Sequence, residues 1–108
     1  MIDFTTIPET PLPRFKDGEG TFFARFAGDA SCKILLGRLP SGATIGLHTH
    51  ETSSEIMYFL SGKGTVTTDG VPETITAGDC HYCKKGSRHT LVNDGEEELV
   101  FFAVVPQQ

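Results

Sequence analysis

The chain has 108 residues, enough for one domain with a single core but too few for two. Its formal charge of −5 and its isoelectric point near 5.2 argue against nucleic acid and anionic membranes as partners, because both require a basic surface. No apolar run approaches the ~20 residues of a membrane-spanning helix, and the first residues lack the basic and apolar regions of a signal peptide. Three cysteines, with Cys32 far from Cys80 and Cys83, favour reduced thiols, so we expect a cytoplasmic protein.

The first twenty residues predict an extended arm. Prolines and glycines are spread through this segment, which rules out a long helix. Apolar side chains such as Phe4 and Phe15 make a free tail unfavourable. We expect residues 1–20 to pack either along the domain formed by residues 21–108 or across a subunit boundary.

From Thr21 onward the pattern is one of short β-like runs separated by turn residues. Asp69-Gly70 is a strong signal for a two-residue hairpin turn, and no segment shows sustained helical periodicity. The pattern predicts an all-β sandwich or barrel. The expected strands are Thr21–Phe26, Ser31–Leu39, Thr44–His50, Glu55–Leu60, Gly64–Thr68, Glu73–Thr76, Cys80–Cys83, Arg88–Asn93 and Glu97–Val105.

Three candidate metal ligands lie close together in the sequence. His48 and His50 are two residues apart, so on a strand both imidazoles point to the same face. A turn of small polar residues then allows a second strand to begin at Glu55 and to return its carboxylate to the same point. Imidazole nitrogen and carboxylate oxygen together suit divalent first-row metals.

Two longer motifs carry a family resemblance. The first resembles the first cupin motif and reads Gly42-x5-His48-x-His50-x4-Glu55-x6-Gly62. The second resembles the second cupin motif, with Gly78, Gly86, His89 and Asn93 in place and Lys84 where the family has proline. The two motifs cover residues 42–93, about half of the chain.

The resemblance implies a fold, a ligand set and a cofactor. The fold is a double-stranded β-helix, also called a jelly-roll or cupin barrel. The implied cofactor is one divalent transition metal ion (Mn, Fe, Co, Ni, Cu or Zn) with one or two open coordination positions. The implied ligands are His48, His50, Glu55 and His89.

Strand alternation indicates which side chains share a face with these ligands. Met57 and Phe59 lie on the face of Glu55, and Leu91 on that of His89, so they either line a ligand pocket or form the barrel core. The His48 strand would add Thr44 and Gly46. These faces carry no arginine or lysine cluster, although Lys33, Arg25 and Arg38 on earlier strands could reach inward.

The strand Cys80–Cys83 offers two arrangements. Its cysteines are three residues apart, so on a strand they point to opposite faces ~10 Å apart, too far for a disulfide. Either Cys80 and Tyr82 or His81 and Cys83 therefore face the pocket. His81 and Tyr82 are the candidates for proton transfer near the metal.

The continuous apolar run Leu99–Val105 predicts a strand buried on both sides, one of which would be a subunit interface. The resemblance supports a homodimer. It also implies a small organic ligand and favours a metal-dependent enzyme of dioxygenase type. An isomerase, a lyase, a decarboxylase and a non-catalytic metabolite-binding protein are the alternatives.

Overall fold

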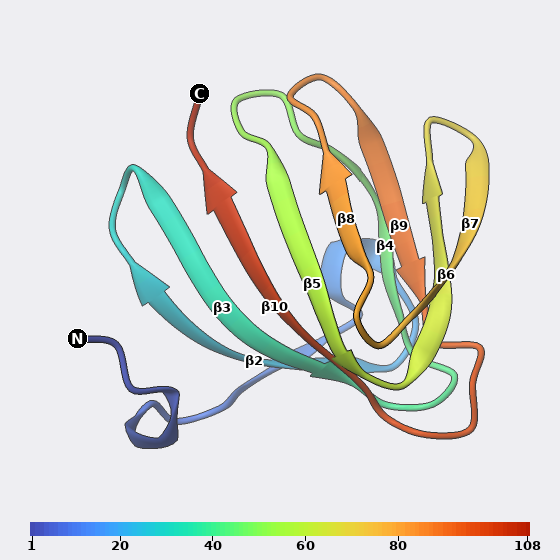
Figure 1. Cartoon of the computed structure of the whole chain (residues 1–108), viewed down its shortest axis with the longest axis horizontal. Coiled ribbons are helices and arrows are strands. Elements are labelled where there is room, and N and C mark those ends of the chain that lie inside the picture. Colours follow the sequence, from blue (N-terminus) through green and yellow to red (C-terminus); the bar gives the residue numbers. More distant parts are fainter.

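The structure, a computed structural model, describes residues 1–108 and consists almost entirely of antiparallel strands (Figure 1). A six-stranded sheet has the order β1-β2-β3-β10-β5-β8, and a four-stranded sheet has the order β4-β9-β6-β7. The sheets face each other as the two halves of a barrel, as expected for a cupin fold. The elements are η1 (Phe4–Thr6), β1 (Thr10–Pro13), η2 (Phe15–Asp17), β2 (Thr21–Gly28), β3 (Cys32–Leu39), β4 (Thr44–Thr49), β5 (Glu55–Ser61), β6 (Lys63–Thr68), β7 (Val71–Thr76), β8 (Cys80–Cys83), β9 (Arg88–Val92) and β10 (Leu99–Pro106).

Each of the nine expected runs forms a strand, and the ends differ by at most two residues. The hairpin between β6 and β7 follows the predicted two-residue turn, since Asp69 and Gly70 both have positive φ angles, 49° and 84°. β7 begins at Val71 because this tight turn brings the chain straight back into pairing with β6.

The core lies between the two sheets and is rich in phenylalanine. Phe22 and Phe101 stack with their ring centroids 5.6 Å apart, and Phe59 packs on Phe101 at 5.8 Å. Ile45 and Leu91 close the core from the four-stranded sheet. The alternation on β5 therefore follows the prediction, with the side chains that share the face of Glu55 buried and the others exposed.

Residues 1–20 pack on the barrel of the same chain. β1 pairs with β2 and forms the edge of the sheet. The η1 turn places Phe4 edge-on to Phe102 of β10, with ring centroids 6.3 Å apart. Arg25 fixes this turn by donating hydrogen bonds to the carbonyl oxygens of Phe4 and Ile7. No helix in the structure is long and apolar enough to cross a membrane.

A β-bulge in β4 sets the direction of its histidines. Ile45 pairs with Leu91, but His48 pairs with His89, so β4 carries one extra residue between these two pairs. The extra residue reverses the alternation of faces. Ile45 and His48 consequently both point into the barrel, while Leu47 between them is exposed. The expectation that Thr44 and Gly46 share the face of His48 was wrong, because uninterrupted alternation does not hold across a bulge.

Two glycines allow η2 to lie directly on β4. A Cβ atom on Gly46 would lie 1.9 Å from the Lys16 carbonyl oxygen, and one on Gly18 would lie 2.3 Å from the Thr44 carbonyl oxygen. No side chain fits in either place. The close contact holds Lys16 in a left-handed conformation, with φ of 57°, that a lysine rarely adopts.

We predict that Gly18→Ala destabilises the protein by about 1–3 kcal/mol, because the added methyl group pushes η2 away from β4. Gly18 has φ of −81°, so alanine meets no backbone strain there and the effect is steric. Urea unfolding of the variant measures the change. Glu19→Ala is the control, because the side chain of Glu19 is exposed; equal stability of the two variants would contradict this account of the contact.

Candidate metal centre

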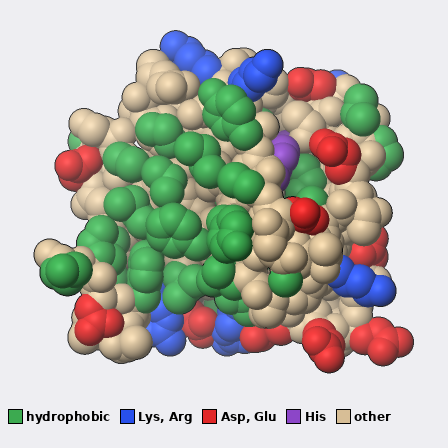
Figure 2. Space-filling model, viewed as in Figure 1, with side chains coloured by type: hydrophobic (Ala, Val, Ile, Leu, Met, Phe, Trp, Pro, Cys, Tyr) green, Lys and Arg blue, Asp and Glu red, His purple; other side chains and the backbone are tan.

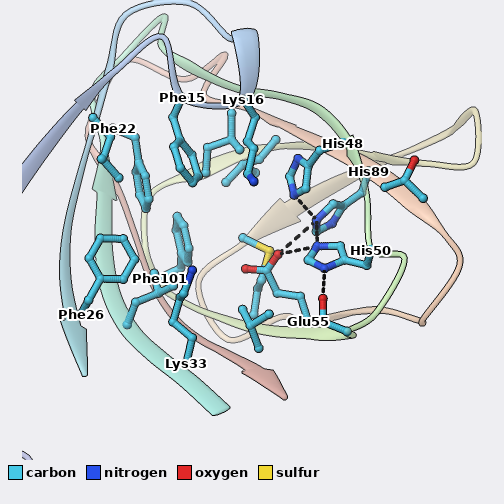
Figure 3. Close-up of a pocket in the computed structure, with 18 of the residues that line it drawn as sticks. Phe15, Lys16, Phe22, Phe26, Lys33, His48, His50, Glu55, His89 and Phe101 are labelled. Carbon is cyan, nitrogen blue, oxygen red and sulfur yellow. Dashed lines mark hydrogen bonds and ion pairs between the residues drawn. The ribbon is translucent and has the colours of Figure 1, made fainter. Parts of the chain in front are cut away.

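Four potential ligands from three separate segments converge at one point (Figure 3). His48 lies on β4 and His50 directly follows that strand. Glu55 is the first residue of β5, and His89 lies on β9, paired with His48. One ligand atom from each of the four residues lies within 4.8 Å of all the others. Three of the four side chains are buried, and His48 is half-buried.

The distances between the ligand atoms fit coordination of a single ion. His89 Nε2 lies 3.0 Å from His50 Nε2, 3.2 Å from His48 Nε2 and 3.1 Å from Glu55 Oε1. Two atoms bound at right angles to one ion, each at about 2.1 Å, are about 3.0 Å apart. The four atoms therefore surround a space of the size that a first-row divalent ion needs.

The outer ring nitrogens orient the three imidazoles. His48 Nδ1 lies 2.8 Å from the Gly46 carbonyl oxygen, which only accepts, so Nδ1 carries the proton and Nε2 has a free lone pair. His50 Nδ1 contacts Ser53 Oγ at 2.8 Å, and His89 Nδ1 contacts His81 Nε2 at 2.9 Å. Each histidine thus uses Nδ1 for a neighbour and directs Nε2 at the shared point. A cation there would satisfy all four atoms at once.

The protonation states also suit a cation. Burial, opposed by the hydrogen bond from Nδ1 to the Gly46 carbonyl, lowers the pKa of His48, which keeps this imidazole neutral. Burial alone would raise the pKa of Glu55, but its hydrogen bonds with His50 and His89 outweigh burial and lower the pKa to about 2. Neutral imidazole and ionised carboxylate are the forms that bind divalent metals. The residues present therefore fit the ion that the sequence motifs imply.

A cavity of about 560 Å³ opens beside the cluster. Of the predicted pocket residues, Met57 and Leu91 line it. Phe59 does not, because it lies deeper in the barrel and is fully buried in the core. Thr52, Ser53 and Gln107 form part of the polar rim. The remaining cavity wall is dominated by aromatic side chains, Phe15, Phe22, Phe26 and Phe101.

Two lysines, Lys16 and Lys33, also line the cavity. Lys33 lies on the inward face of β3, two residues before buried Leu35, in agreement with the expectation that it could reach inward. Lys16 belongs to the N-terminal segment, where no periodicity indicates a direction. The one available signal was its position beside Gly18 and Gly20, which indicates an unusual local backbone.

The strand β8 turns His81 and Cys83 inward. In its pairing with β5, His81 lies opposite Met57 and Cys83 opposite Glu55, both of which face the barrel interior. Cys80 and Tyr82 point outward, and Tyr82 is 54% exposed. The structure thus places two predicted candidates, Tyr82 for proton transfer and Cys80 for the pocket, away from the cavity.

His81 and Cys83 lie behind the ligand cluster and do not line the cavity. His81 contacts His89, and burial followed by the charge of His89 lowers the pKa of His81 to about 4. The ring of His81 is therefore neutral and can accept a hydrogen bond from His89 Nδ1. Burial, with smaller effects of Glu55 and Asp69, raises the pKa of the Cys83 thiol to about 11, so this sulfur is protonated at neutral pH. A thiol in that state is a poor metal ligand.

Two antiparallel sheets with three imidazoles and one carboxylate converging between them define a class of β-barrel proteins with an internal site able to hold a metal. Residues 35–105 match the family described as the cupin domain. The chain belongs to this cupin family, as the two sequence motifs had indicated.

Similar proteins include several whose names refer to oxalate. An oxalate-binding protein of Thermotoga maritima is 40% identical over 68 residues, which cover 63% of this chain and 56% of that protein. The oxalate decarboxylase of Bacillus subtilis is 37% identical over 68 residues, which cover 58% of this chain and 18% of the enzyme. The matched region thus spans about half or less of these curated relatives.

Solved structures agree with the fold. The crystal structure of a predicted oxalate decarboxylase from Thermotoga maritima has a TM-score of 0.94 and 26% identity, and the match covers 100% of this chain and 99% of that one. A sugar phosphate isomerase of the cupin superfamily from Silicibacter pomeroyi has a TM-score of 0.79 at 21% identity, covering 100% and 76% of the two chains. The second likeness shows the shared fold alone.

We predict that His89→Ala lowers the affinity for a divalent metal by about 100-fold. Loss of a residue that only hydrogen-bonds to a metal ligand already lowers metal affinity by about 10–100-fold, and loss of a ligand should cost at least as much. The metal content of the protein after dialysis against Mn²⁺, measured by mass spectrometry, tests this. Tyr82→Phe serves as the control, because Tyr82 points away from the cluster. A His89→Ala variant that retains the normal amount of metal would refute the assignment of His89 as a ligand.

Proposed function

We propose that the protein binds a divalent first-row metal ion through His48, His50, Glu55 and His89, and that this site binds a small carboxylate anion. The observation that carries the proposal is the convergence of four ligand atoms, at spacings near 3 Å, on the wall of a cavity. Four protein ligands leave open positions on a six-coordinate ion. When bound, the metal supplies a Lewis acid for the ligand's oxygen atoms.

The relatives support a carboxylate as the ligand. The names of two of them refer to oxalate, one as a binding protein and one as a decarboxylase. The cavity itself suits an anion, because Lys16 and Lys33 line it together with the ligand cluster. With a divalent ion present, the positive charges in the cavity outnumber Glu51 and Glu55. The dioxygenase chemistry that the family resemblance favoured finds no support among these relatives.

We predict that the Mn²⁺-loaded protein binds oxalate and that the metal-free protein does not. The ligand has so few atoms that its binding free energy cannot exceed about −9 kcal/mol, so the Kd should be no tighter than about 0.3 µM. Isothermal titration calorimetry measures the affinity, and the metal content is checked afterwards to exclude extraction of the ion by oxalate.

His89→Ala should lose oxalate binding together with the metal, and the outward variant Tyr82→Phe should keep both. Equal affinity of the loaded and metal-free proteins for oxalate, or no binding to either, would rule out the proposed function.

Decarboxylation is a second candidate, favoured by Glu51. This carboxyl group lines the cavity next to His50 and makes no ion pair with either lysine. Conversion of oxalate and one proton into formate and carbon dioxide requires a group that delivers the proton to carbon. An assay for formate in the same samples distinguishes catalysis from binding. Formate production that is lost in Glu51→Gln, with oxalate binding retained, would assign this step to Glu51.

The outer face of the six-stranded sheet supports the expected homodimer. Val104 of β10 pairs with Ile34 and Ile56, and Phe102 pairs with Leu36 and Tyr58. Figure 2 shows the hydrophobic side chains gathered over β3, β10 and β5. An apolar surface of this extent is unfavourable in water, and a second copy of the chain would cover it.

We predict a mass of twice 11.7 kDa by light scattering and a shift to the monomer in Tyr58→Glu. The new carboxylate would lie in an apolar interface, where an unpaired charge is costly. Thr74→Glu on the exposed side of β7 is the control. A wild-type protein that is monomeric at micromolar concentration would exclude the dimer.

A further inference from the structure

The cavity has two chemically different ends (Figure 3). One end holds the ligand cluster, and the other is walled by Phe15, Phe22, Phe26 and Phe101. Its volume of about 560 Å³ lies within the range of ~300–1,000 Å³ that holds drug-sized ligands. An anion as small as oxalate would occupy only the metal end. The aromatic end would then stay in contact with water, which is unfavourable for an apolar wall.

Two ammonium groups flank this space. Lys16 Nζ lies 5.4 Å from the ring centroid of Phe15, and Lys33 Nζ lies 5.6 Å from that of Phe26. Neither lysine forms an ion pair, whereas Arg38 is paired with both Glu9 and Glu98. The contact of an ammonium group with an aromatic face is worth only about 0.5–1 kcal/mol at an exposed site. Both charges therefore remain available to an anionic ligand.

The fold holds both lysines at the cavity from opposite sides. Lys33 shares the inward face of β3 with buried Leu35, so strand alternation directs it into the barrel. Lys16 lies on η2, whose left-handed backbone is held against β4 by the close contact at Gly46. Strained backbone of this kind is found where function requires a particular side-chain position.

We propose that the preferred ligand is a 2-oxo acid with an apolar, best an aromatic, side chain rather than oxalate itself. Its adjacent carboxylate and keto oxygens would take the place of the oxygen pair of oxalate at the metal. Lys16 and Lys33 would bind the carboxylate charge, and the phenylalanine end would enclose the side chain. This proposal rests on the proposed function, because it uses the same metal-bound oxygen pair.

Three probes that each present two adjacent oxygen atoms to the metal test it in the Mn²⁺-loaded protein: oxalate, pyruvate and benzoylformate. Pyruvate and benzoylformate differ only in the group attached to the keto carbon, a methyl against a phenyl. Calorimetry should show that benzoylformate binds more tightly than oxalate and at least tenfold more tightly than pyruvate, with unchanged metal content.

Variants separate the contribution of the aromatic wall to binding from that of the lysine charge. Phe26→Ala should abolish the preference for benzoylformate and leave pyruvate binding unchanged. Phe23→Ala is its matched control, because Phe23 lies on the same strand but does not line the cavity. Lys33→Met keeps the apolar stem but removes the charge, and should weaken all three ligands about tenfold. Lys85→Met is the control for the lost charge and should leave the binding of all three ligands unchanged, because Lys85 lies in the exposed turn after β8.

The outcomes distinguish the two proposals. Suppose that oxalate binds in a metal-dependent way and that pyruvate and benzoylformate bind with equal affinity. This result would overturn the proposal of an aromatic 2-oxo acid and leave the proposed function intact. Failure of the Mn²⁺-loaded protein to bind any of the three anions would overturn both the proposed function and the proposal of an aromatic 2-oxo acid. A preference for benzoylformate that Phe26→Ala leaves unchanged would likewise overturn the assignment of the aromatic end as its binding site.

Discussion

The site depends on the single extra residue in β4 around Gly46. Without this bulge, the alternation that buries Ile45 would turn His48 outward, and His89 would be the only metal-ligand candidate of the β4–β9 pair facing the cavity. The same glycine accepts the hydrogen bond from His48 Nδ1, which leaves Nε2 free to bind a cation. Its missing side chain also makes room for the Lys16 carbonyl group. One local irregularity thus places a ligand, fixes its tautomer and seats the N-terminal segment.

The N-terminal segment contributes to the cavity as well as to the sheet. β1 extends the six-stranded sheet, and η2 then carries Phe15 and Lys16 over the cavity. Neither residue belongs to the matched region 35–105, whereas all four metal-ligand candidates and Phe101 do, so part of the far end of the cavity comes from outside that region. A change in this segment could alter the ligand that fits the cavity without altering the metal cluster.

The electrostatics of the cluster favour a cation over an empty site. The four ligand atoms lie within 4.8 Å of one another, and at least one of them, His48 Nε2, has a free lone pair. The carboxylate of Glu55 remains ionised despite its burial, since His50 and His89 both contact it. A divalent ion between these atoms would bind all four at once, and the negative charge of Glu55 would favour it.

Local patterns in the sequence determined the strands, the hairpin at Asp69-Gly70 and the likeness of its motifs to those of cupins, because alternation, turn chemistry and motif spacing depend only on neighbouring residues. Tertiary structure alone decided which face of β8 is inward, so that His81 and not Tyr82 lies near the cluster. Tertiary structure also decided which side chains of β4 point into the barrel and that Lys16 lies at the cavity. The direction of a side chain depends on the register between strands, and that register is set by partners distant in the sequence.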